Sequence, residues 1–139
     1  MFSWIVAHPY AYPALGVVHV AGIGLLVGSL VVFECRLWGA APAVPLAALA
    51  RLALPLTLCG FVLAAASGLL MFASQPEDLL ANRAFVVKMG LLMLAGTNAG
   101  IFHARGGVAK ADRVARWQTA LSLGTWLGVI ICGRWIAYY

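Results

Sequence analysis

Apolar residues form four long stretches along this chain, and polar residues gather in the short segments between them. The stretches predict helices over residues 14–36, 48–73, 84–104 and 115–137. Each is at least as long as the roughly 20 residues that an α-helix needs to cross a bilayer. No period-two alternation, which is typical of half-buried strands, competes with this interpretation. The pattern therefore predicts an all-α integral membrane protein, built as an antiparallel four-helix bundle in a single domain, because short connections make successive helices antiparallel neighbours.

Composition supports contact with lipid. The chain has 139 residues, of which 64% are hydrophobic and only 9% are charged, whereas soluble domains carry about 25% charged residues. A chain of this size has a large surface for its volume. It cannot hide so much apolar surface in a fold that faces water on all sides. A lipid bilayer is therefore its first expected partner.

Three prolines constrain the ends of the predicted helices. Pro9 and Pro13 break the first thirteen residues, which we interpret as a short interfacial lead-in to the first helix. Pro55 is expected in the first turn or two of the second helix, where the missing N–H group does least harm.

The basic residues indicate how the helices are oriented. The first and third loops, with the adjacent helix ends, hold Arg36, Arg51, Arg105, Lys110, Arg113 and Arg116, and the other side holds Arg83, Lys88 and Arg134. Cytoplasmic loops carry an excess of Lys and Arg. We therefore expect a protein of the bacterial cytoplasmic membrane with both termini outside. This topology signal accounts for most of the net charge of +5, and no nucleic-acid-binding motif is present.

Small residues recur four apart in every predicted helix. The pairs are Gly24 and Gly28, Gly60 with Ala64 and Gly68, Gly96 and Gly100, and Gly124 and Gly128. Such pairs let helix backbones approach closely in lipid, either within one chain or between copies in an oligomer. Alternatively, some glycines make room for a flat cofactor. Gly16 and Gly22, three residues either side of His19, would leave space for a porphyrin face.

Ionisable residues at membrane depth are costly and usually functional. His19 is expected about 8 Å, and Lys88 about 9 Å, to the outer side of the centres of two parallel helices. The two residues therefore share a layer. His19 is either a buried histidine with a satisfied hydrogen bond or a cofactor ligand. Lys88 either reaches the headgroups or points into the bundle toward His19.

The other candidates lie at different depths. Met71 and Arg134 fall roughly 12–13 Å outward, and His103 lies on the inner side, about 13–15 Å from the centre. His19 and His103 are therefore about 20 Å apart along the bundle, too far to ligate one haem iron together. Each must serve a separate metal site, or only one is a ligand. His103 can equally be an interfacial side chain.

Two further polar positions are expected to be structural. Glu34 and Arg36 are predicted to form an ion-pair network with Arg105 or Lys110 on the inner side. Asn98 is predicted to bond across helices, an interaction that typically contributes about 0.6 kcal/mol.

Several segments resemble a family of small bacterial four-helix membrane proteins whose function is unknown. The segments are HVAGIGLLVGSLVVFECRLWG from His19, NRAFVVKMGLLMLAGTN from Asn82, Phe102–His103, and SLGTWLGVIICGRWIAY from Ser122. The resemblance covers nearly the whole chain and implies a four-helix membrane fold.

Two better-known groups are similar in part. The membrane domain of CopD-like copper-resistance proteins is similar in a first-helix histidine followed by small residues, here His19 and Gly22. HemJ-type protoporphyrinogen oxidases are similar in having four helices of this total length. They also have a histidine in the first helix, an arginine at its far end and a lysine in the third helix, which His19, Arg36 and Lys88 match here. That resemblance implies a haem or porphyrin between the helices. The chain differs from the HemJ type in having Gly24 to Gly28 where an aromatic residue is expected.

The first functional hypothesis is a membrane redox or electron-transfer protein that binds haem b. His19 would be the axial ligand and Met71 a candidate sixth ligand, while Lys88 and Arg134 would pair with propionates. His103 is a second candidate metal ligand. A quinone or a membrane redox partner would exchange electrons with the haem. If the protein is an enzyme, it is expected to be an oxidoreductase acting on a quinol or a porphyrin.

Two alternatives come from other classes. A copper-handling protein would use His8, His19 and Met71, because thioether ligands suit Cu(I). A non-catalytic accessory subunit would use its small-residue faces to pack against a larger membrane complex.

Overall fold

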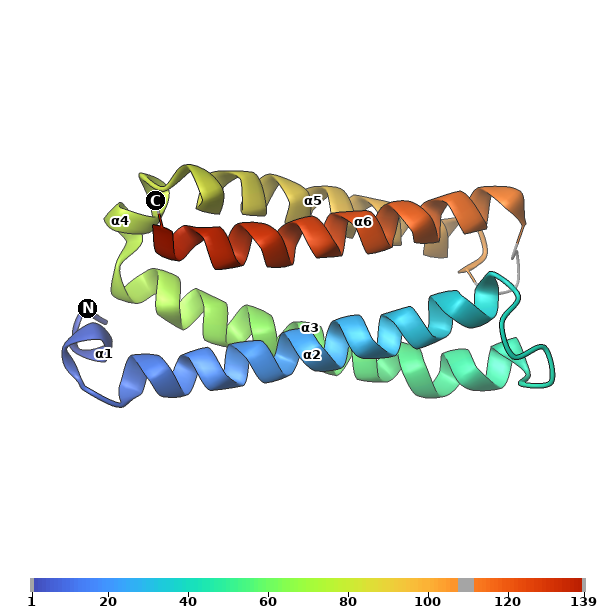
Figure 1. The fold of residues 1–139 in the computed structure, drawn as a ribbon, viewed down its shortest axis with the longest axis horizontal. Coiled ribbons are helices and arrows are strands. Elements are labelled where there is room, and N and C mark those ends of the chain that lie inside the picture. Colours follow the sequence, from blue (N-terminus) through green and yellow to red (C-terminus); the bar gives the residue numbers. More distant parts are fainter. Residues whose placement is uncertain (1, 108–111, 139) are drawn as a thin grey trace. The chain divides into compact units, whose positions relative to one another are not determined.

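The computed structural model describes residues 2–107 and 112–138. The helices are α1 (Trp4–Ala7), α2 (Ala11–Leu37), α3 (Leu46–Ser74), α4 (Pro76–Leu80), α5 (Arg83–Ala104), α6 (Arg113–Trp135) and the 3-10 helix η2 (Ile136–Tyr138) (Figure 1). Four of them, α2, α3, α5 and α6 continued by η2, are long and apolar enough to cross a membrane. The predicted fold class, an all-α protein with four membrane-length helices, is confirmed.

Few side chains of these helices are buried inside the protein. In each membrane-length helix, only 11–17% of the most apolar 18-residue segment is buried inside the protein. Large apolar side chains such as Val17, Leu69 and Met93 are 67–75% exposed. Exposing this much apolar surface to water is unfavourable, and the four helices therefore fit a membrane protein in contact with lipid.

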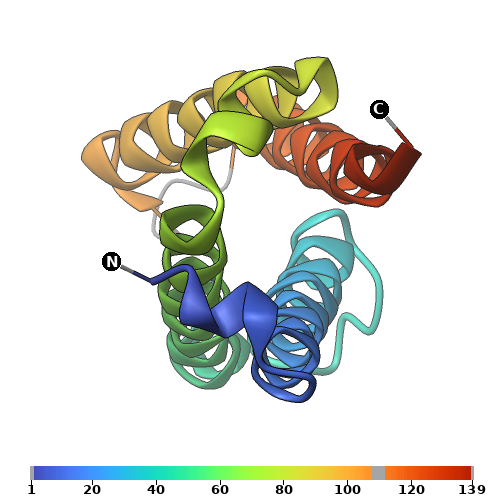
Figure 2. The ribbon, with the colours of Figure 1, turned by 90° about the vertical axis from the view of Figure 1, so that its left-hand side faces the viewer.

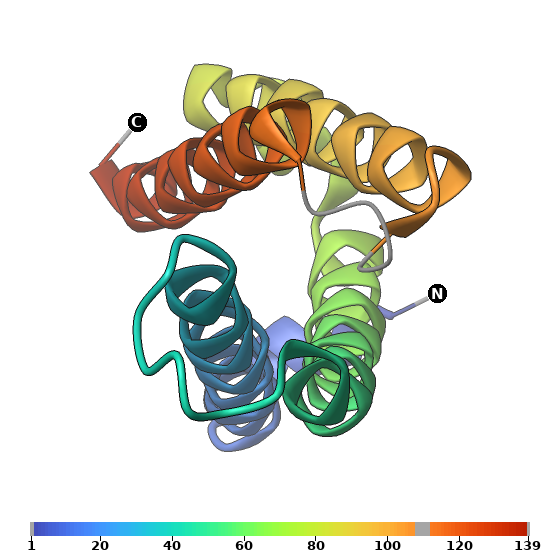
Figure 3. The same ribbon diagram turned by 90° about the vertical axis from the view of Figure 1, so that its right-hand side faces the viewer.

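The chain divides into two compact units. Unit 1 comprises the residues up to Val32 together with Arg51–Ala81, and unit 2 comprises Phe33–Ala50 together with the chain from Asn82 onward. In unit 1, α2 and α3 lie side by side and run in opposite directions (Figures 1 and 2). In unit 2, α5 and α6 form a second antiparallel pair (Figure 3).

Unit 1 is held together by a close approach of two helix backbones. A methyl group at Gly22 would lie 2.7 Å from the backbone nitrogen of Ala64 and 2.8 Å from the carbonyl oxygen of Gly60. Further along the same pair of helices, the hydroxyls of Ser29 and Thr57 are 2.7 Å apart and share a hydrogen bond. This seam confirms the predicted packing role of Gly60 and Ala64. A Cβ at Gly24 or Gly28, the pair predicted on α2, would meet no atom within 4 Å in the described part of the chain.

Unit 2 relies more on side-chain hydrogen bonds. Asn82 caps α5, since its Oδ1 accepts from the first backbone N–H groups of the helix, and its Nδ2 donates to the carbonyl oxygen of Ile136 at 2.9 Å. Asn98 Nδ2 donates to the carbonyl oxygen of Gln118 at 2.7 Å. This second bond joins α5 to α6, and it confirms the interhelical role predicted for Asn98.

The prolines lie differently from the prediction. Helix α2 already begins at Ala11, so that Pro13 lies in its first turn, where proline is tolerated. Helix α3 begins at Leu46, directly after Pro45. Pro55 is consequently the tenth residue of α3, and its expected place in the first turn or two was wrong. The helix continues through Pro55 although one internal N–H donor is missing.

Candidate functional site

His19 is a half-buried residue of α2 whose ring contacts α3. Its Nδ1 lies 2.8 Å from the carbonyl oxygen of Ala64 and 3.2 Å from the hydroxyl of Ser67. A carbonyl oxygen can only accept a hydrogen bond, so Nδ1 carries the proton and donates it. The Ser67 hydroxyl donates to the carbonyl oxygen of Leu63 at 2.7 Å and can accept from the imidazole. In this tautomer Nε2 is the basic nitrogen of His19.

Small residues of α3 make room for the imidazole ring. A methyl group at Gly68 would lie 3.2 Å from Cε1 of His19, and Ala64 and Ser67 complete the surface beneath the ring. Met71 follows Ser67 by four residues and therefore lies one turn further along the same face of α3. Sequence reasoning identified His19 and Met71 but missed Ser67, although the Ala64 and Gly68 pair marked the same face of the helix.

Lys88 and Arg134 come to the same end of unit 2. The ammonium nitrogen of Lys88 on α5 lies 3.6 Å from the position that a Gly133 side chain would take, so Lys88 reaches toward α6 at the residue before Arg134. The Arg134 guanidinium donates to the Tyr138 hydroxyl at 3.1 Å and lies 5.3 Å from the centre of that ring. The two cations predicted to pair with haem propionates therefore lie on neighbouring helices.

His103 is exposed near the end of α5. Its ring meets the Phe102 ring edge to face, with the two centroids 5.3 Å apart. Lys88 lies fifteen residues earlier on the same helix, which places the two residues about 22 Å apart. This position fits an interfacial side chain, and a metal-binding role for His103 stays a prediction.

The predicted site residues therefore form two sets. His19 and Met71 belong to unit 1, while Lys88, His103 and Arg134 belong to unit 2. The predicted pairing of Lys88 with His19 stays a prediction. Within residues 2–107 and 112–138, no group of three or more His, Cys, Asp or Glu side chains is arranged to hold a metal ion.

Glu34 is a candidate that sequence reasoning treated only as structural. It lies in the last turns of α2, and 1% of the residue is exposed. The Ser122 hydroxyl of α6 lies beside its carboxyl group. Neither carboxyl oxygen, however, has a partner with hydrogen-bond geometry in the described part of the chain.

The ion-pair network expected around Glu34 was wrong for the residues that the structure describes. Arg36 Nε donates to a backbone carbonyl oxygen of the loop that follows α2, at 2.6 Å, and Arg105 pairs with Asp112 at 3.0 Å. Side chains two residues apart point to different faces of a helix, which separates Glu34 from Arg36. Lys110, the other expected partner, lies outside the described residues.

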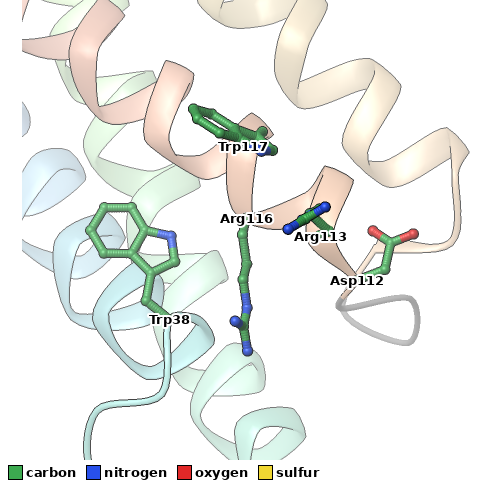
Figure 4. A pocket seen from close by; sticks show the side chains of 5 residues that line it. All are labelled: Trp38, Asp112, Arg113, Arg116 and Trp117. Atoms are coloured by element: carbon green, nitrogen blue, oxygen red, sulfur yellow. The ribbon is translucent and has the colours of Figure 1, made fainter.

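An open cavity of about 550 Å³ lies at the end of unit 2 where α6 begins. It is lined by Trp38, Asp112, Arg113, Arg116 and Trp117 (Figure 4). The cavity combines two guanidinium groups and one carboxylate with two indole rings. Because Trp38 is four residues after Glu34 on the same stretch of chain, this cavity begins about one helical turn from the buried carboxyl group.

Asp112 is anchored at the start of α6. Its Oδ1 accepts from the backbone N–H of Ala115 at 2.9 Å, and its Oδ2 accepts from Arg105 at 3.0 Å. The Ala115 N–H, followed by the Arg105 guanidinium, holds the pKa of the Asp112 carboxyl below its ordinary value of 3.8. The carboxylate of Asp112 is thus already neutralised by Arg105.

Comparison of the chain with protein-family models, with curated proteins and with solved structures finds no match.

Proposed function

We propose that this protein is a membrane electron-transfer protein that binds haem b, with Nε2 of His19 as an axial ligand of the iron. The observation that carries the proposal is the hydrogen bond from His19 Nδ1 to the Ala64 carbonyl oxygen, at 2.8 Å. Histidines that ligate metals almost always donate their other ring N–H to a carbonyl, a carboxylate or water. That bond orients the ring and makes Nε2 the basic nitrogen, which is the one that would coordinate the iron.

Haem needs few protein ligands, because the porphyrin itself supplies four nitrogens to the iron. A single oriented imidazole would therefore be a sufficient anchor, and Met71, on the same face of α3 as Ser67, would be a candidate for a second protein ligand. Met and His together are the axial pair of many electron-transfer haems. When bound, the haem would supply an iron centre that gains and loses one electron.

The rest of the chain fits this group in part. Lys88 and Arg134, on neighbouring helices of unit 2, are suited to pair with carboxylates such as propionates. The space expected beside Gly22 is not open, since the backbone of α3 fills it. Gly16 has no neighbour within 4 Å in the described part of the chain. Gly16 and Gly22 were both expected to leave space for a porphyrin face, and the proposal retains this role for Gly16 alone.

The proposal also includes the location and partners of the protein. The distribution of Lys and Arg favours the bacterial cytoplasmic membrane with both termini outside. A quinone or another redox protein of the same membrane would then exchange electrons with the haem. The small residues on the outer faces of the helices are suited to oligomer contacts.

The visible absorption spectrum tests the proposal. Protein expressed with ample haem supply and purified in detergent should show a Soret band. The variant His19→Ala should lose this band while its circular dichroism and gel-filtration profile show that it remains folded. His103→Ala removes the second candidate ligand, and a full band in this variant would show that the haem is held by His19 without His103.

Two results would contradict the proposal. One is a wild-type protein without a Soret band, and the other is a His19→Ala variant that keeps it. Metal analysis of the same preparations then identifies the alternative. Copper bound to the wild type but not to His19→Ala would indicate the copper-handling function, and protein free of metal would favour an accessory subunit.

A further inference from the structure

The carboxyl group of Glu34 belongs to a membrane-length helix, α2, in the part of that helix that lies in unit 2. The residue is 1% exposed, and neither of its oxygens has a hydrogen-bond donor with suitable geometry among the described residues. A carboxylate in this position would be shielded from water, and the Ser122 hydroxyl is the polar side chain that the described part of the chain places beside it. Burying an unpaired charge is far more unfavourable than burying the neutral acid.

Two cations on α5 and directly after it, in the described part of unit 2, are held away from Glu34. On α5, Lys88 lies against Gly133, which is eleven residues from Ser122 along α6 and therefore about 16 Å from it. Arg105, which follows α5, is paired with Asp112. A neutral carboxylic acid is the form of Glu34 that these surroundings favour.

Other charged groups in the described part of this unit also lie elsewhere. Arg36 bonds a loop carbonyl oxygen, His103 is exposed near the end of α5, and Arg134 bonds Tyr138. Arg113 and Arg116 line the open cavity at the start of α6. The polar group beside the Glu34 carboxyl is the hydroxyl of Ser122.

Two hydroxyl-bearing residues of α6 lie between the level of this carboxyl group and the cavity. Ser122 and Thr119 lie one turn apart on α6, and the Thr119 hydroxyl accepts a hydrogen bond from the Trp38 indole N–H at 2.7 Å. Trp38 in turn lines the open cavity of about 550 Å³ (Figure 4). Water in that cavity is thus separated from Glu34 by about one helical turn that carries two hydroxyl groups.

We propose that Glu34 is a proton-binding site in the membrane-embedded part of unit 2, which exchanges its proton with water of the cavity lined by Trp38. On release, an O–H bond of the carboxylic acid breaks and a water molecule of the cavity takes the proton. On binding, the same steps run in reverse. This site is independent of haem binding, since it uses no residue of the His19 environment.

Infrared spectroscopy of the full-length protein in detergent or liposomes tests this site. The chain contains only four Asp and Glu residues, so bands of the carboxyl groups can be assigned by single substitutions. At neutral pH we expect the carbonyl stretching band of a protonated carboxylic acid, with a small shift in heavy water. The variant Glu34→Gln should lose the band completely, and Glu34→Asp should restore it at a shifted frequency.

Glu77→Gln is the matched control, since Glu77 is an exposed residue of α4, and it should leave the band unchanged. Wild type without the band at neutral pH, or Glu34→Gln with the band intact, would overturn the proposal. If Glu34→Gln does not fold, the wild type alone decides by reaction with dicyclohexylcarbodiimide, which attacks neutral carboxylic acids. Mass spectrometry should find the adduct on Glu34, and adducts only on Glu77, Asp78 or Asp112 would refute the site.

Discussion

The two units of this protein both use interhelical hydrogen bonds, but only unit 1 shows a close approach of helix backbones in the described part of the chain. In unit 1, α2 and α3 touch through their backbones at Gly22 and Gly60, and even the polar His19 bonds a backbone carbonyl oxygen. In unit 2, side chains make the connections, as Asn82 bonds Ile136 and Asn98 bonds Gln118.

Both means suit a protein in lipid, where burial of apolar surface does not drive helices together. Close packing of glycines gains dispersion contacts, whereas interhelical hydrogen bonds satisfy groups that lipid cannot solvate. We therefore expect the stability of the two units to respond to different kinds of substitution. Unit 1 should be sensitive to added volume, and unit 2 to lost polarity.

The largest expected effect is in unit 1. Gly60→Val places Cβ 2.5 Å from the backbone nitrogen of Leu26 and 2.6 Å from the carbonyl oxygen of Gly22. Backbone atoms cannot move aside as a flexible side chain can, so the loss should exceed the roughly 1–3 kcal/mol typical of an overpacked core. Thermal unfolding in detergent, followed by circular dichroism, should show a strong decrease in the Tm or little folded protein.

Gly24→Val is the matched control, because a side chain at Gly24 meets no atom within 4 Å in the described part of the chain. Its Tm should stay near that of the wild type. Equal losses in the two variants would indicate that the valine side chain itself, and not the seam of unit 1, is responsible.

The second effect tests polarity in unit 2. Asn82→Ala removes the cap of α5 and the hydrogen bond to Ile136, which together should destabilise the protein by about 1–2 kcal/mol. Asn82→Ser keeps an acceptor for the cap but loses the amide donor, so its loss should be smaller, about 0.6 kcal/mol. Denaturant titration in mixed micelles measures both. A larger loss in Asn82→Ser than in Asn82→Ala would contradict this assignment.

Much of the fold could be predicted because a membrane crossing leaves a strong signal in the sequence. Long uncharged runs mark each helix, and the scarcity of polar residues singles out His19 and Asn98 as positions that need partners. The interhelical bond of Asn98 confirms this reasoning. Helix ends were less predictable, because apolar residues occur on both sides of the position where a helix begins. Pro55 is an example, since it was expected in the first turn or two of α3 and is the tenth residue of that helix.

The direction in which side chains point could not be predicted. The long helices are apolar on nearly all faces, so no periodicity of the sequence tells which face is turned toward a neighbouring helix. The ion-pair network expected around Glu34 and Arg36 failed for this reason. Depth along the axis could be estimated for each residue, but the rotation of α2 places Glu34 against α6 and Arg36 against the loop that follows α2.

A smaller effect is expected at Gly68, which, unlike Gly24, lies against the imidazole ring of His19. Gly68→Ala adds a methyl group 3.2 Å from Cε1 of His19, so the imidazole must shift by a few tenths of an ångström. Gly24→Ala adds the same group in open space and reports the effect of alanine alone. We expect the Soret maximum and the reduction potential of haem-loaded protein to change in Gly68→Ala and not in Gly24→Ala. Unchanged values in both would mean that the contact with Gly68 does not tune the ligand.

The smallest effect is expected at the surface end of unit 2 and depends on pH. The pKa of the Asp112 carboxyl lies below its ordinary value of 3.8, first because of the Ala115 N–H and then because of Arg105. The folded state therefore binds fewer protons here than the unfolded state, and the stabilisation is present above that ordinary value. It is lost as the pH falls through the lowered pKa of the folded protein.

Asp112→Asn keeps an oxygen that can accept from Ala115 but removes the charge that pairs with Arg105. At neutral pH its Tm should be lower than that of the wild type by no more than a few degrees, because exposed ion pairs contribute little. In strongly acidic solution the two proteins should unfold at nearly the same temperature, since the wild-type carboxyl is then protonated as well. A difference that persists unchanged in acid would show that the substitution acts on the α6 cap itself, and that the charge of Asp112 does not stabilise this end of unit 2.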